Sequence, residues 1–550
     1  MKALKSNYPV VIAGAGPAGL TLANLLGTQG IEVLLVERNA STVHEPRAVS
    51  IDDESLRTMQ AAGLVEEVRS AIVPGYGSHY LSPGGICFAK VEPTGRPYGY
   101  PRRNAFRQPI LESQLLEGLA RFPCVTTRFC CTLTGFTQSH EAVSCDLLDE
   151  DGTARRVTCA YLVGCDGASS TIRKLLAIAL EGTSFKERWL IVDLENSESE
   201  THHTKVFCDP LRPCIALPGP DRTRRYEFKL HDHERDEDLL DPVTVDRLLA
   251  THCADPRSIV RRKVVYTFHA RMATRWSEGR VFLAGDAAHL TPPFAGQGMN
   301  SGLRDVHNLF WKLAAVLRGR AGPRLLDSYE DERRDHAWQM IELALRMGHI
   351  MAPRNLLTAM AMQLGFLALH LCPPARDYVA EMKYKPKPRF AAGFLVPDGR
   401  PPRRTLVGRL FPQPQLRRAD DTLALLDDLI GNEFCLLAYD IAPEALGAAF
   451  RLPVWDRLGA RRVLVLPPGA NPKPAEFIVA IDEAGSLAKT LAPYAGHLLL
   501  LRPDHYVAAA LPLAAIEHGA AAIEALLAQT WKDGTPSGAR PSPATAEAPA

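Results

Sequence analysis

The sequence has almost no net charge, and this absence excludes one class of partner. Its 63 lysines and arginines balance 62 acidic residues, which leaves a formal net charge of +1. Arginine clusters such as Arg102-Arg103 and Arg403-Arg404 are short and scattered, so they favour a solvated surface over a nucleic-acid-binding patch. Nucleic acid is therefore not an expected partner.

Metal-binding and redox patterns of cysteine are also missing. The 12 cysteines include no CxxC pair and no Cys/His spacing typical of zinc. The only adjacent pair is Cys130-Cys131, and neighbouring cysteines rarely form a disulfide. We therefore expect free thiols, a reducing compartment and no metal.

No apolar run is long enough to cross a bilayer. The most hydrophobic segment, 356–372, contains Thr358, Gln363 and His370 and is shorter than the roughly 20 residues that a span requires. It predicts a buried helix or a subunit-contact helix. The apolar N-terminal run is interrupted by a glycine loop, which indicates a folded strand and not a signal peptide. These features predict a cytoplasmic protein with no membrane partner.

The N-terminus contains a dinucleotide-binding fingerprint. An apolar run, YPVVIA, leads into GAGPAG, a helix, and a second strand that ends in an acidic residue. The glycines permit a tight turn and bring a pyrophosphate close to the helix N-terminus, while the acid accepts hydrogen bonds from ribose hydroxyls. An acid in this place suits an unphosphorylated ribose. The predicted binding residues are Gly14, Gly16, Gly19 and Glu37.

Segment 281–313, VFLAGDAAHLTPPFAGQGMNSGLRDVHNLFWKL, predicts a socket for a polar, partly anionic cofactor. Gly285 lets the backbone approach a ligand, and Asp286 can accept hydrogen bonds from sugar hydroxyls. Free amides at the start of the following helix favour negative charge. Taken alone, the segment also fits an ordinary strand-to-helix turn. The residues expected at the helix start are Gly298, Met299, Asn300 and Ser301.

A third motif lies in segment 161–174, YLVGCDGASSTIRK, where another strand leads into a helix. Ser169 or Ser170 suits the N-cap position, and Arg173 lies one turn into the helix, where it can form a salt bridge or reach a phosphate. A capped surface helix has the same pattern, so this motif leaves both interpretations open.

The order GxGxxG, DG, GD resembles that of the single-component flavoprotein aromatic hydroxylases, the para-hydroxybenzoate hydroxylase type. The segments PRAVSIDDESLRTMQAAGLVEEV (46–68), YPRRNAFRQP (100–109) and DERRDHA (331–337) are similar to the members that act on 3-(3-hydroxyphenyl)propionate. This similarity covers nearly the whole chain. It implies that NADH reduces FAD, that dioxygen reacts with the reduced flavin, and that one oxygen atom enters a phenol ring ortho to its hydroxyl.

The resemblance also assigns site residues. It places the fingerprint residues at the adenosine half of FAD and Asp286 at the ribityl chain or pyrophosphate. Arg47 and Gln108 match flavin contacts, while Asp166 and Arg173 match residues that support the cofactor and nicotinamide docking. Pro292, Pro293 and the 296–300 turn are expected to line the isoalloxazine ring. The loop PPFAGQGMN differs from the compared hydroxylases before GQG, which leaves the exact substrate open.

Candidate substrate residues come from the strands between the second and third motifs. A propionate side chain needs a cationic or amide anchor, for which Arg212 and Arg225 are candidates. Strand alternation turns only some neighbouring side chains inward, so each candidate can also be a core or sheet-surface residue. Tyr226, Tyr266 and His269 are candidate polar partners of the phenol. His289 is expected to pack within its loop.

The predicted fold is α/β, α+β overall, with a Rossmann-like FAD-binding domain, an inserted antiparallel-sheet substrate domain and a C-terminal thioredoxin-like domain. Cys435 is the only cysteine of the last domain, which excludes dithiol chemistry there and favours a structural or dimer-supporting role. The resemblance suggests a homodimer. The boundaries are 1–75, 103–180 and 275–345 for the FAD-binding domain, 76–102 and 181–274 for the substrate domain, 346–390 for a helical connector, 391–530 for the thioredoxin-like domain and 531–550 for a disordered tail.

Three functions stay open at this point. The first is NADH-dependent hydroxylation of 3-(3-hydroxyphenyl)propionate, and of the related cinnamate, to the 2,3-dihydroxy product in aromatic catabolism. The second is hydroxylation of another phenol, such as resorcinol, a chlorophenol or a polyketide. The third is an FAD-binding redox sensor or assembly protein without oxygenase turnover. The preference for NADH over NADPH comes from the resemblance alone, since the sequence has no second dinucleotide fingerprint.

Overall fold

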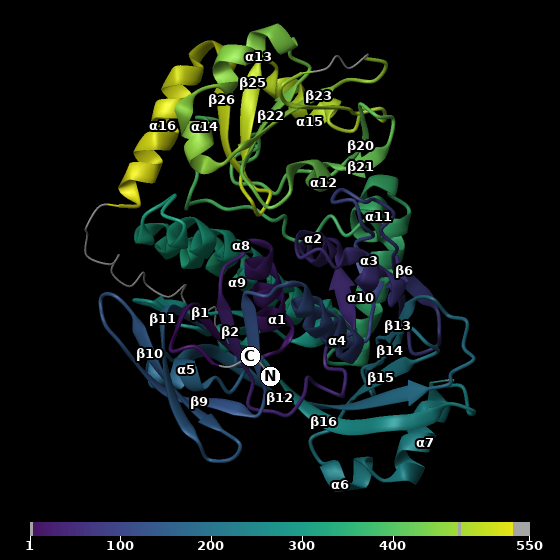
Figure 1. Cartoon of the computed structure of the whole chain (residues 1–550). Helices are drawn as coiled ribbons and strands as arrows, with labels where there is room; N and C mark the ends of the chain where they lie inside the picture. The colour runs from purple at the N-terminus through teal and green to yellow at the C-terminus, as the bar shows by residue number, and fades with distance from the viewer. Residues whose placement is uncertain (1–3, 253, 471–474, 532–550) are drawn as a thin grey trace.

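The computed structural model describes residues 4–252, 254–470 and 475–531. Figure 1 shows the C-terminal sheet at the top of the molecule, helices α8 and α9 through the middle, and a large sheet that includes β15 and β16 at the bottom. Trp531 is half exposed, and the remainder of the predicted tail lies outside the described residues.

The first sheet carries the nucleotide-binding fingerprint. Its path is β17-β18-β11-β1-β2-β8, with β10 beside β11 and β9 beside β10. Strands β8, β2, β1, β11 and β18 are parallel, so their carboxyl ends meet at one edge. The strands are β1 (Asn7–Ala13), β2 (Val33–Val36), β8 (Val125–Arg128), β9 (Cys131–Gln138), β10 (Val143–Asp149), β11 (Ala154–Gly164), β17 (Ser277–Glu278) and β18 (Val281–Leu283).

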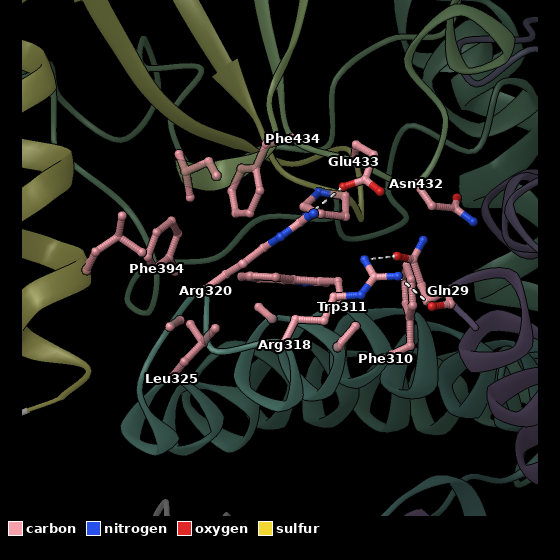
Figure 2. A pocket seen from close by; sticks show the side chains of 16 residues that line it. Gln29, Phe310, Trp311, Arg318, Arg320, Leu325, Phe394, Asn432, Glu433 and Phe434 are labelled. Atoms are coloured by element: carbon pink, nitrogen blue, oxygen red, sulfur yellow. Dashed lines mark hydrogen bonds and ion pairs between the residues drawn. The ribbon is translucent and has the colours of Figure 1, made fainter. Parts of the chain in front are cut away.

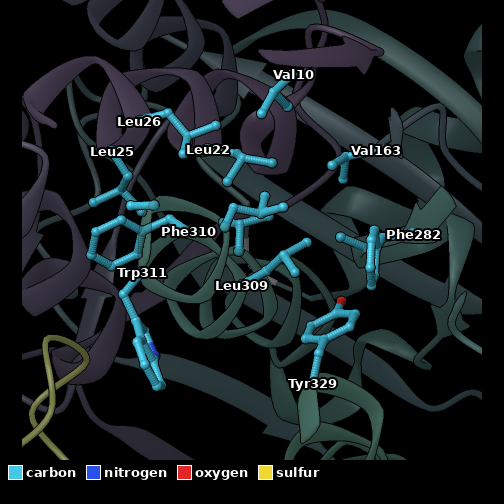
Figure 3. Close-up of a cluster of buried hydrophobic side chains, with 14 of the residues drawn as sticks. Val10, Leu22, Leu25, Leu26, Val163, Phe282, Leu309, Phe310, Trp311 and Tyr329 are labelled. Atoms are coloured by element: carbon cyan, nitrogen blue, oxygen red, sulfur yellow. The ribbon is translucent and has the colours of Figure 1, made fainter. Parts of the chain in front are cut away.

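Two helices, α1 (Pro17–Thr28) and α8 (Gly298–Leu317), pack together against this sheet. Figure 3 shows Leu22 and Leu26 of α1 near Leu309 of α8, all fully buried. The following helix, α9 (Ser328–Met351), fixes the sheet edge because the Tyr329 hydroxyl donates to the carbonyl of Leu283 at 2.9 Å. Apolar burial of this extent is the main stabilising contribution to the domain.

The second sheet is formed mainly by the inserted segment. Its order is β19-β16-β12-β15-β14-β13-β5-β6, antiparallel except where β13 meets β5. One face is covered by α6 (Asp236–Leu239) and α7 (Pro242–Thr251), and the other faces the first sheet's loops. The strands are β5 (Ser78–Leu81), β6 (Cys87–Val91), β12 (Leu180–Glu195), β13 (Thr204–Phe207), β14 (Cys214–Pro218), β15 (Arg224–Lys229), β16 (Ile259–Ala273) and β19 (His289–Leu290).

Short elements connect the two sheets. Strands β3 (Ser50–Asp52), β7 (Arg103–Ala105) and β4 (Val73–Pro74) form a three-stranded sheet in that order. The helices beside it and at the DG motif (161–174) are α2 (Asp53–Ala61), α3 (Val65–Ser70), α4 (Gln108–Gly118) and α5 (Thr171–Leu175).

Helix α10 (Leu356–His370) does not form a buried helix, so that alternative is wrong. Leu357 and Leu364 are 78% and 64% exposed, and only Ala359 is buried. A role in subunit contact stays a prediction. In the described part of the chain, no single helix is long and apolar enough to cross a membrane; α10 and α11 (Pro373–Ala380) meet the length and composition test together but bend by 114° at their break.

The C-terminal region has the predicted alternation of strands and helices. Its sheet order is β21-β20-β24-β23-β22-β25-β26, with β22, β23 and β24 parallel. Cys435 lies buried in β22 as a free thiol. The elements are β20 (Gln415–Arg418), β21 (Leu423–Leu425), α12 (Leu426–Ile430), β22 (Cys435–Tyr439), α13 (Pro443–Phe450), α14 (Pro453–Leu458), β23 (Arg461–Leu466), β24 (Ile478–Ile481), α15 (Ala488–Leu491), β25 (His497–Leu501), β26 (Val507–Pro512) and α16 (Ile516–Gln529).

An apolar seam joins this region to α8. Figure 2 shows Trp311 of α8 facing Phe394 and Phe434, and the Trp311 and Phe434 rings meet edge-on with centroids 5.5 Å apart. The gap that remains is about 30 Å³, room for little more than a water molecule. This seam is therefore a packing interface and not a ligand site.

Buried charges next to the seam are paired with one another. Arg502 donates to both carboxylate oxygens of Glu332 at 2.8 and 2.7 Å and also contacts Asp504, while Lys312 donates to Glu332 at 2.9 Å. Burial alone raises the pKa of Glu332, but the Arg502 and Lys312 cations outweigh it and hold this pKa at about 2. We call Lys312, Glu332, Arg502 and Asp504 the junction cluster.

Candidate functional site

The three predicted motifs meet beside one cavity of about 360 Å³. They converge because Ala13 pairs with Gly164, and Gly164 pairs with Leu283, at the ends of neighbouring parallel strands. The second sheet closes the opposite side. The lining from the motif loops includes Gly16, Ala18, Cys165, Gly167, Gly285 and Asp286.

The fingerprint loop is packed so closely that two positions accept only glycine. Gly14 has φ +106°, and a Cβ there would lie 2.3 Å from the Cys165 carbonyl oxygen; a Cβ on Gly19 would lie 1.9 Å from that of Gly14. Open space lies above Gly16. Glu37 accepts a hydrogen bond from the Ala15 amide at 2.8 Å, so the predicted ribose acid also holds the loop.

The GD loop is fixed from below by buried polar groups. Gly285 has φ +61°, and its amide donates to Asp305 at 3.2 Å. His289 pairs with the same carboxylate at 2.6 Å, and both side chains are fully buried. His289 therefore has the predicted loop-packing role. Asp286 instead exposes its carboxylate at the cavity, with no hydrogen-bond partner for it among the described residues.

The DG motif is tied to the GD loop. Asp166 accepts from the amides of Thr171 and Ile172, and Ser170 is the N-cap of α5, as one of the two predicted serines. Arg173 donates to the Ala287 carbonyl at 2.9 Å, so it holds the neighbouring loop. The second oxygen of Asp166 is buried with no partner in the described chain. Such an orphaned acceptor fits a ligand hydroxyl.

The start of α8 faces the cavity through its backbone. Its first intrahelical bond runs from Ser301 to Gln297, which leaves the earlier amides free for a ligand. The Asn300 side chain points elsewhere, donating to the carbonyls of Ser50 and Gly296. A cofactor contact at Asn300 would therefore come from its backbone amide, as the prediction for this helix start has it. Pro293 lines the cavity, whereas Pro292 is buried and does not.

Arg47 and Gln108, which the PRA and RQP motifs predict as flavin contacts, both line the cavity. The Gln108 side-chain oxygen accepts from the Arg47 and Ala48 amides at 3.1 and 2.8 Å, and its nitrogen donates to Glu112. The Arg47 side chain is exposed beside the cavity. The PRA loop is thus held from the side of α4.

Arg225 is not a substrate anchor, contrary to its predicted role. Its guanidinium forms an ion pair with Asp193 at 2.7 Å and donates to the carbonyls of Pro46 and Arg47. It is 4% exposed and does not line the cavity. The second sheet therefore uses Arg225 to hold the PRA loop.

The other predicted substrate residues also lie away from the cavity. Tyr226 faces the opposite side of the sheet, where its ring stacks on Phe228 beneath α7. Arg212 pairs with Glu234, and His269 pairs with Ser184. Tyr266 lies beside Arg262 and is not among the lining residues. Strand alternation is the physical reason for the position of Tyr226.

Several polar side chains line the cavity although no motif predicts them. Glu227 lies two residues after Arg225, so strand parity alone could have placed it on the inner face. The others come from distant segments, which no local pattern brings together. They are Tyr76, Tyr80, Arg103, Tyr384 and Lys385. The last two belong to the predicted connector, which therefore contributes directly to the cavity wall.

These features fit a flavin dinucleotide: a glycine loop at a helix start, an orphaned buried acceptor, and a second helix start beside the same cavity. The fold and site thus define a flavoprotein. A family model described as FAD binding domain matches residues 7–344, and one described as HcaD C-terminal domain matches residues 408–526.

Curated relatives narrow the class. The chain is 39% identical to the 3-(3-hydroxy-phenyl)propionate/3-hydroxycinnamic acid hydroxylase of Escherichia coli (strain SMS-3-5 / SECEC), over 92% of each chain. It is 38% identical to the protein of that name from Shigella sonnei (strain Ss046), with the same coverage. The chain therefore belongs to the single-component FAD-dependent aromatic hydroxylases.

Solved structures support the same fold. The flavin-dependent monooxygenase PieE, in complex with FAD and substrate, matches with a TM-score of 0.80 at 24% identity, covering 96% of this chain and 100% of that one. Aklavinone-11 hydroxylase, with FAD and aklavinone, matches with a TM-score of 0.76 at 25% identity and the same coverage. The predicted fold class and FAD cofactor are confirmed.

Proposed function

We propose that this enzyme uses NADH and O2 to hydroxylate 3-(3-hydroxyphenyl)propionate, and the related 3-hydroxycinnamate, ortho to the phenol. The observation that carries the proposal is the cavity itself. Flavin-binding loops form one side, and a second-sheet face with both apolar and polar groups forms the other. The identity of 39% over 92% of the chain supports the choice of substrate.

Bound FAD supplies the chemistry of the reaction, which is reduction by NADH and transfer of one oxygen atom from O2 to the ring. The protein binds, orients and shields the reactants. Phe294, Met347 and Met351 give the cavity an apolar wall that limits access of water. The free amides at the start of α8 favour negative charge at the nearby part of the cofactor.

The proposed cofactor contacts are those whose backbone or side chain faces the cavity. Gly14 and Gly19 shape the loop, while Gly16 and Asp286 border open space. Asp166 contributes its unpartnered oxygen. The predicted division into domains stays part of the proposal, as do a cytoplasmic location and a homodimer in which the exposed apolar side of α10 is the contact.

The experiment that tests the function follows NADH oxidation by the purified FAD-loaded enzyme in air. Addition of 3-(3-hydroxyphenyl)propionate is expected to stimulate oxidation and to give a product heavier by one oxygen atom. Parallel assays with NADPH test the nucleotide preference. Stimulation without hydroxylated product would contradict the proposed substrate, because the compound would then act only as an effector.

A second candidate is hydroxylation of a larger phenol. It is favoured by the TM-score of 0.76 with aklavinone-11 hydroxylase, whose structure holds FAD and aklavinone. A panel of resorcinol, chlorophenols and polycyclic phenols, assayed by the same product mass, distinguishes this candidate from the first. A protein that binds FAD but oxidises NADH no faster with any phenol would instead be a redox or assembly protein.

A further inference from the structure

One end of the cavity presents a cation that no acidic residue neutralises. Arg103, on β7, donates to the Ser78 hydroxyl and, at 3.2 Å, to the Tyr76 hydroxyl; its guanidinium also lies 4.4 Å from the centre of the Tyr76 ring. Within the described ranges, no carboxylate lies within ion-pair distance of Arg103. The guanidinium has five N–H donors, so several remain for a ligand.

The other cavity cations differ from Arg103 in their partners or exposure. Lys385 is held at 3.0 Å by both Asp52 and Glu54, and these acids also bind Arg304. Arg47 is exposed at the cofactor side. Because buried or half-buried charges are normally paired, the unpaired Arg103 indicates a place for an anionic ligand group.

The second sheet presents an acid to the same cavity. Glu227, on β15, is 5% exposed, and its carboxyl group has no hydrogen bond to any described residue. Arg225, two residues earlier, is already occupied by Asp193 and two carbonyls. Burial raises the pKa of Glu227 to about 7, more than nearby Arg225 lowers it. A carboxyl of this pKa can accept or return a proton near neutral pH.

The sheet register separates Glu227 from β5, the strand whose Ser78 accepts a hydrogen bond from Arg103. Glu227 pairs with Ile215, Ile215 with Val206, and Val206 with Tyr80, so β15 and β5 are three strand spacings apart. At about 4.8 Å per spacing, their backbones are roughly 14 Å apart. Ser78, which accepts from Arg103, lies on the inner face of β5 with Tyr80.

Space for a ligand ring lies between the two groups. Ile215, Leu217 and Thr204 line the cavity on the intervening strands β14 and β13. Arg103 and Glu227 both line this cavity, and no ion pair joins them in the described part of the chain. An aromatic ring with a short acid arm suits this arrangement, since the ring can rest on the apolar side chains between the polar ends.

We propose that Arg103 binds the carboxylate of the substrate and that Glu227 accepts the proton of its phenol. This assignment rests on the proposed function and names its substrate class: aromatic acids with a hydroxyl at the end of the ring system remote from the carboxylate. The phenol O–H bond breaks, a bond from the proton to a Glu227 carboxylate oxygen forms, and the ring becomes an electron-rich phenolate. No redox change occurs in this step.

The anchor is tested on the FAD-loaded enzyme with two ligands, 3-(3-hydroxyphenyl)propionate and the uncharged 3-propylphenol. Binding is followed through perturbation of the flavin absorbance. Arg103→Met should weaken binding of the acid by about 10- to 100-fold, the range for loss of a hydrogen bond to a charged group. Binding of 3-propylphenol should change little, and Arg103→Lys should restore part of the affinity for the acid.

Arg212→Met is the matched control, because Arg212, in the bend before β14, pairs with Glu234 and does not line the cavity. It should leave both affinities unchanged. If Arg103→Met retains no FAD, the wild-type enzyme still tests the anchor. The wild type should then bind the acid much more tightly than it binds 3-propylphenol. Equal wild-type affinities, or equal losses of both ligands in Arg103→Met, would overturn the anchor.

The proton acceptor is tested by the ultraviolet spectrum of the bound ligand. The wild-type complex should show a phenolate band that grows as pH rises through about 7, whereas Glu227→Gln should bind the acid as a neutral phenol over the same range. An unchanged phenolate titration in Glu227→Gln would overturn the role of Glu227. If the wild type forms no hydroxylated product from the acid, the proposed function fails; if it forms product while these variants behave as wild type, only the present inference fails.

Discussion

Buried charges serve different purposes in two regions of this molecule. In the junction cluster, Arg502 and Lys312 are fully buried and bound to carboxylates. In the cavity, Glu227 is buried but has no hydrogen bond among the described residues, and Arg103 has no acidic partner there. A paired cluster satisfies its own charges and fixes an interface, whereas unpaired groups are available to a ligand.

The largest effect on folding is expected from breaking the junction cluster. Arg502→Met leaves Glu332 and Asp504 buried with less compensating charge, which should lower the free energy of unfolding by about 3–5 kcal/mol. Urea unfolding of the FAD-loaded protein measures this. As a control, Arg451→Met removes an exposed ion pair with Glu476 and should change stability by less than about 1 kcal/mol. Equal effects of the two variants would contradict the comparison.

Arg225→Met should have the next largest effect. It leaves Asp193 buried but still 3.6 Å from Arg262, so the free energy of unfolding should fall by about 2–3 kcal/mol. Because Arg225 also holds the PRA loop, FAD affinity should fall, while the affinities for a carboxylated and an uncharged phenol should change by the same factor. A selective loss of the carboxylated ligand would restore Arg225 as the anchor.

The unpaired acid of the cavity should make stability depend on pH. Burial raises the pKa of Glu227 from 4.5 to about 7, so the folded state holds its proton more tightly than the unfolded state. The resulting stabilisation is complete below about pH 4.5 and is lost as pH rises through about 7. Relative to Glu227→Gln, the wild type should therefore lose roughly 2–3 kcal/mol across this range.

Paired urea titrations of wild type and Glu227→Gln at pH 5 and pH 8 measure this difference. The free energy of unfolding of Glu227→Gln, relative to that of the wild type, should be higher at pH 8 than at pH 5. A constant difference between the two proteins would show that Glu227 titrates alike when folded and unfolded. Glu234→Gln, which removes the partner of Arg212 outside the cavity, is the control.

The nucleotide-binding half was predictable because its signals are local. Each motif, such as GAGPAG, combines a strand end with a helix start, and parallel pairing then brings the ends together. The substrate end depends on strand parity and on distant segments. Tyr226 and Glu227 are adjacent in the same strand, yet only Glu227 faces the cavity. No local pattern joins Arg103 to Tyr384, which lies beyond the whole second sheet in the chain.

The smallest effect on folding, with a large effect on the cofactor, is expected at Asp286. Its carboxylate is exposed to the cavity and accepts no hydrogen bond from the described residues, so Asp286→Ala removes no internal contact. The variant should unfold at the same urea concentration as wild-type apoprotein but retain little FAD. Asp246→Ala, on the exposed side of α7, should remain fully yellow. Absorbance of the purified proteins and circular dichroism distinguish cofactor loss from misfolding. A fully yellow Asp286→Ala would refute the assigned contact and would leave the backbone amides and Asp166 as the groups that hold FAD.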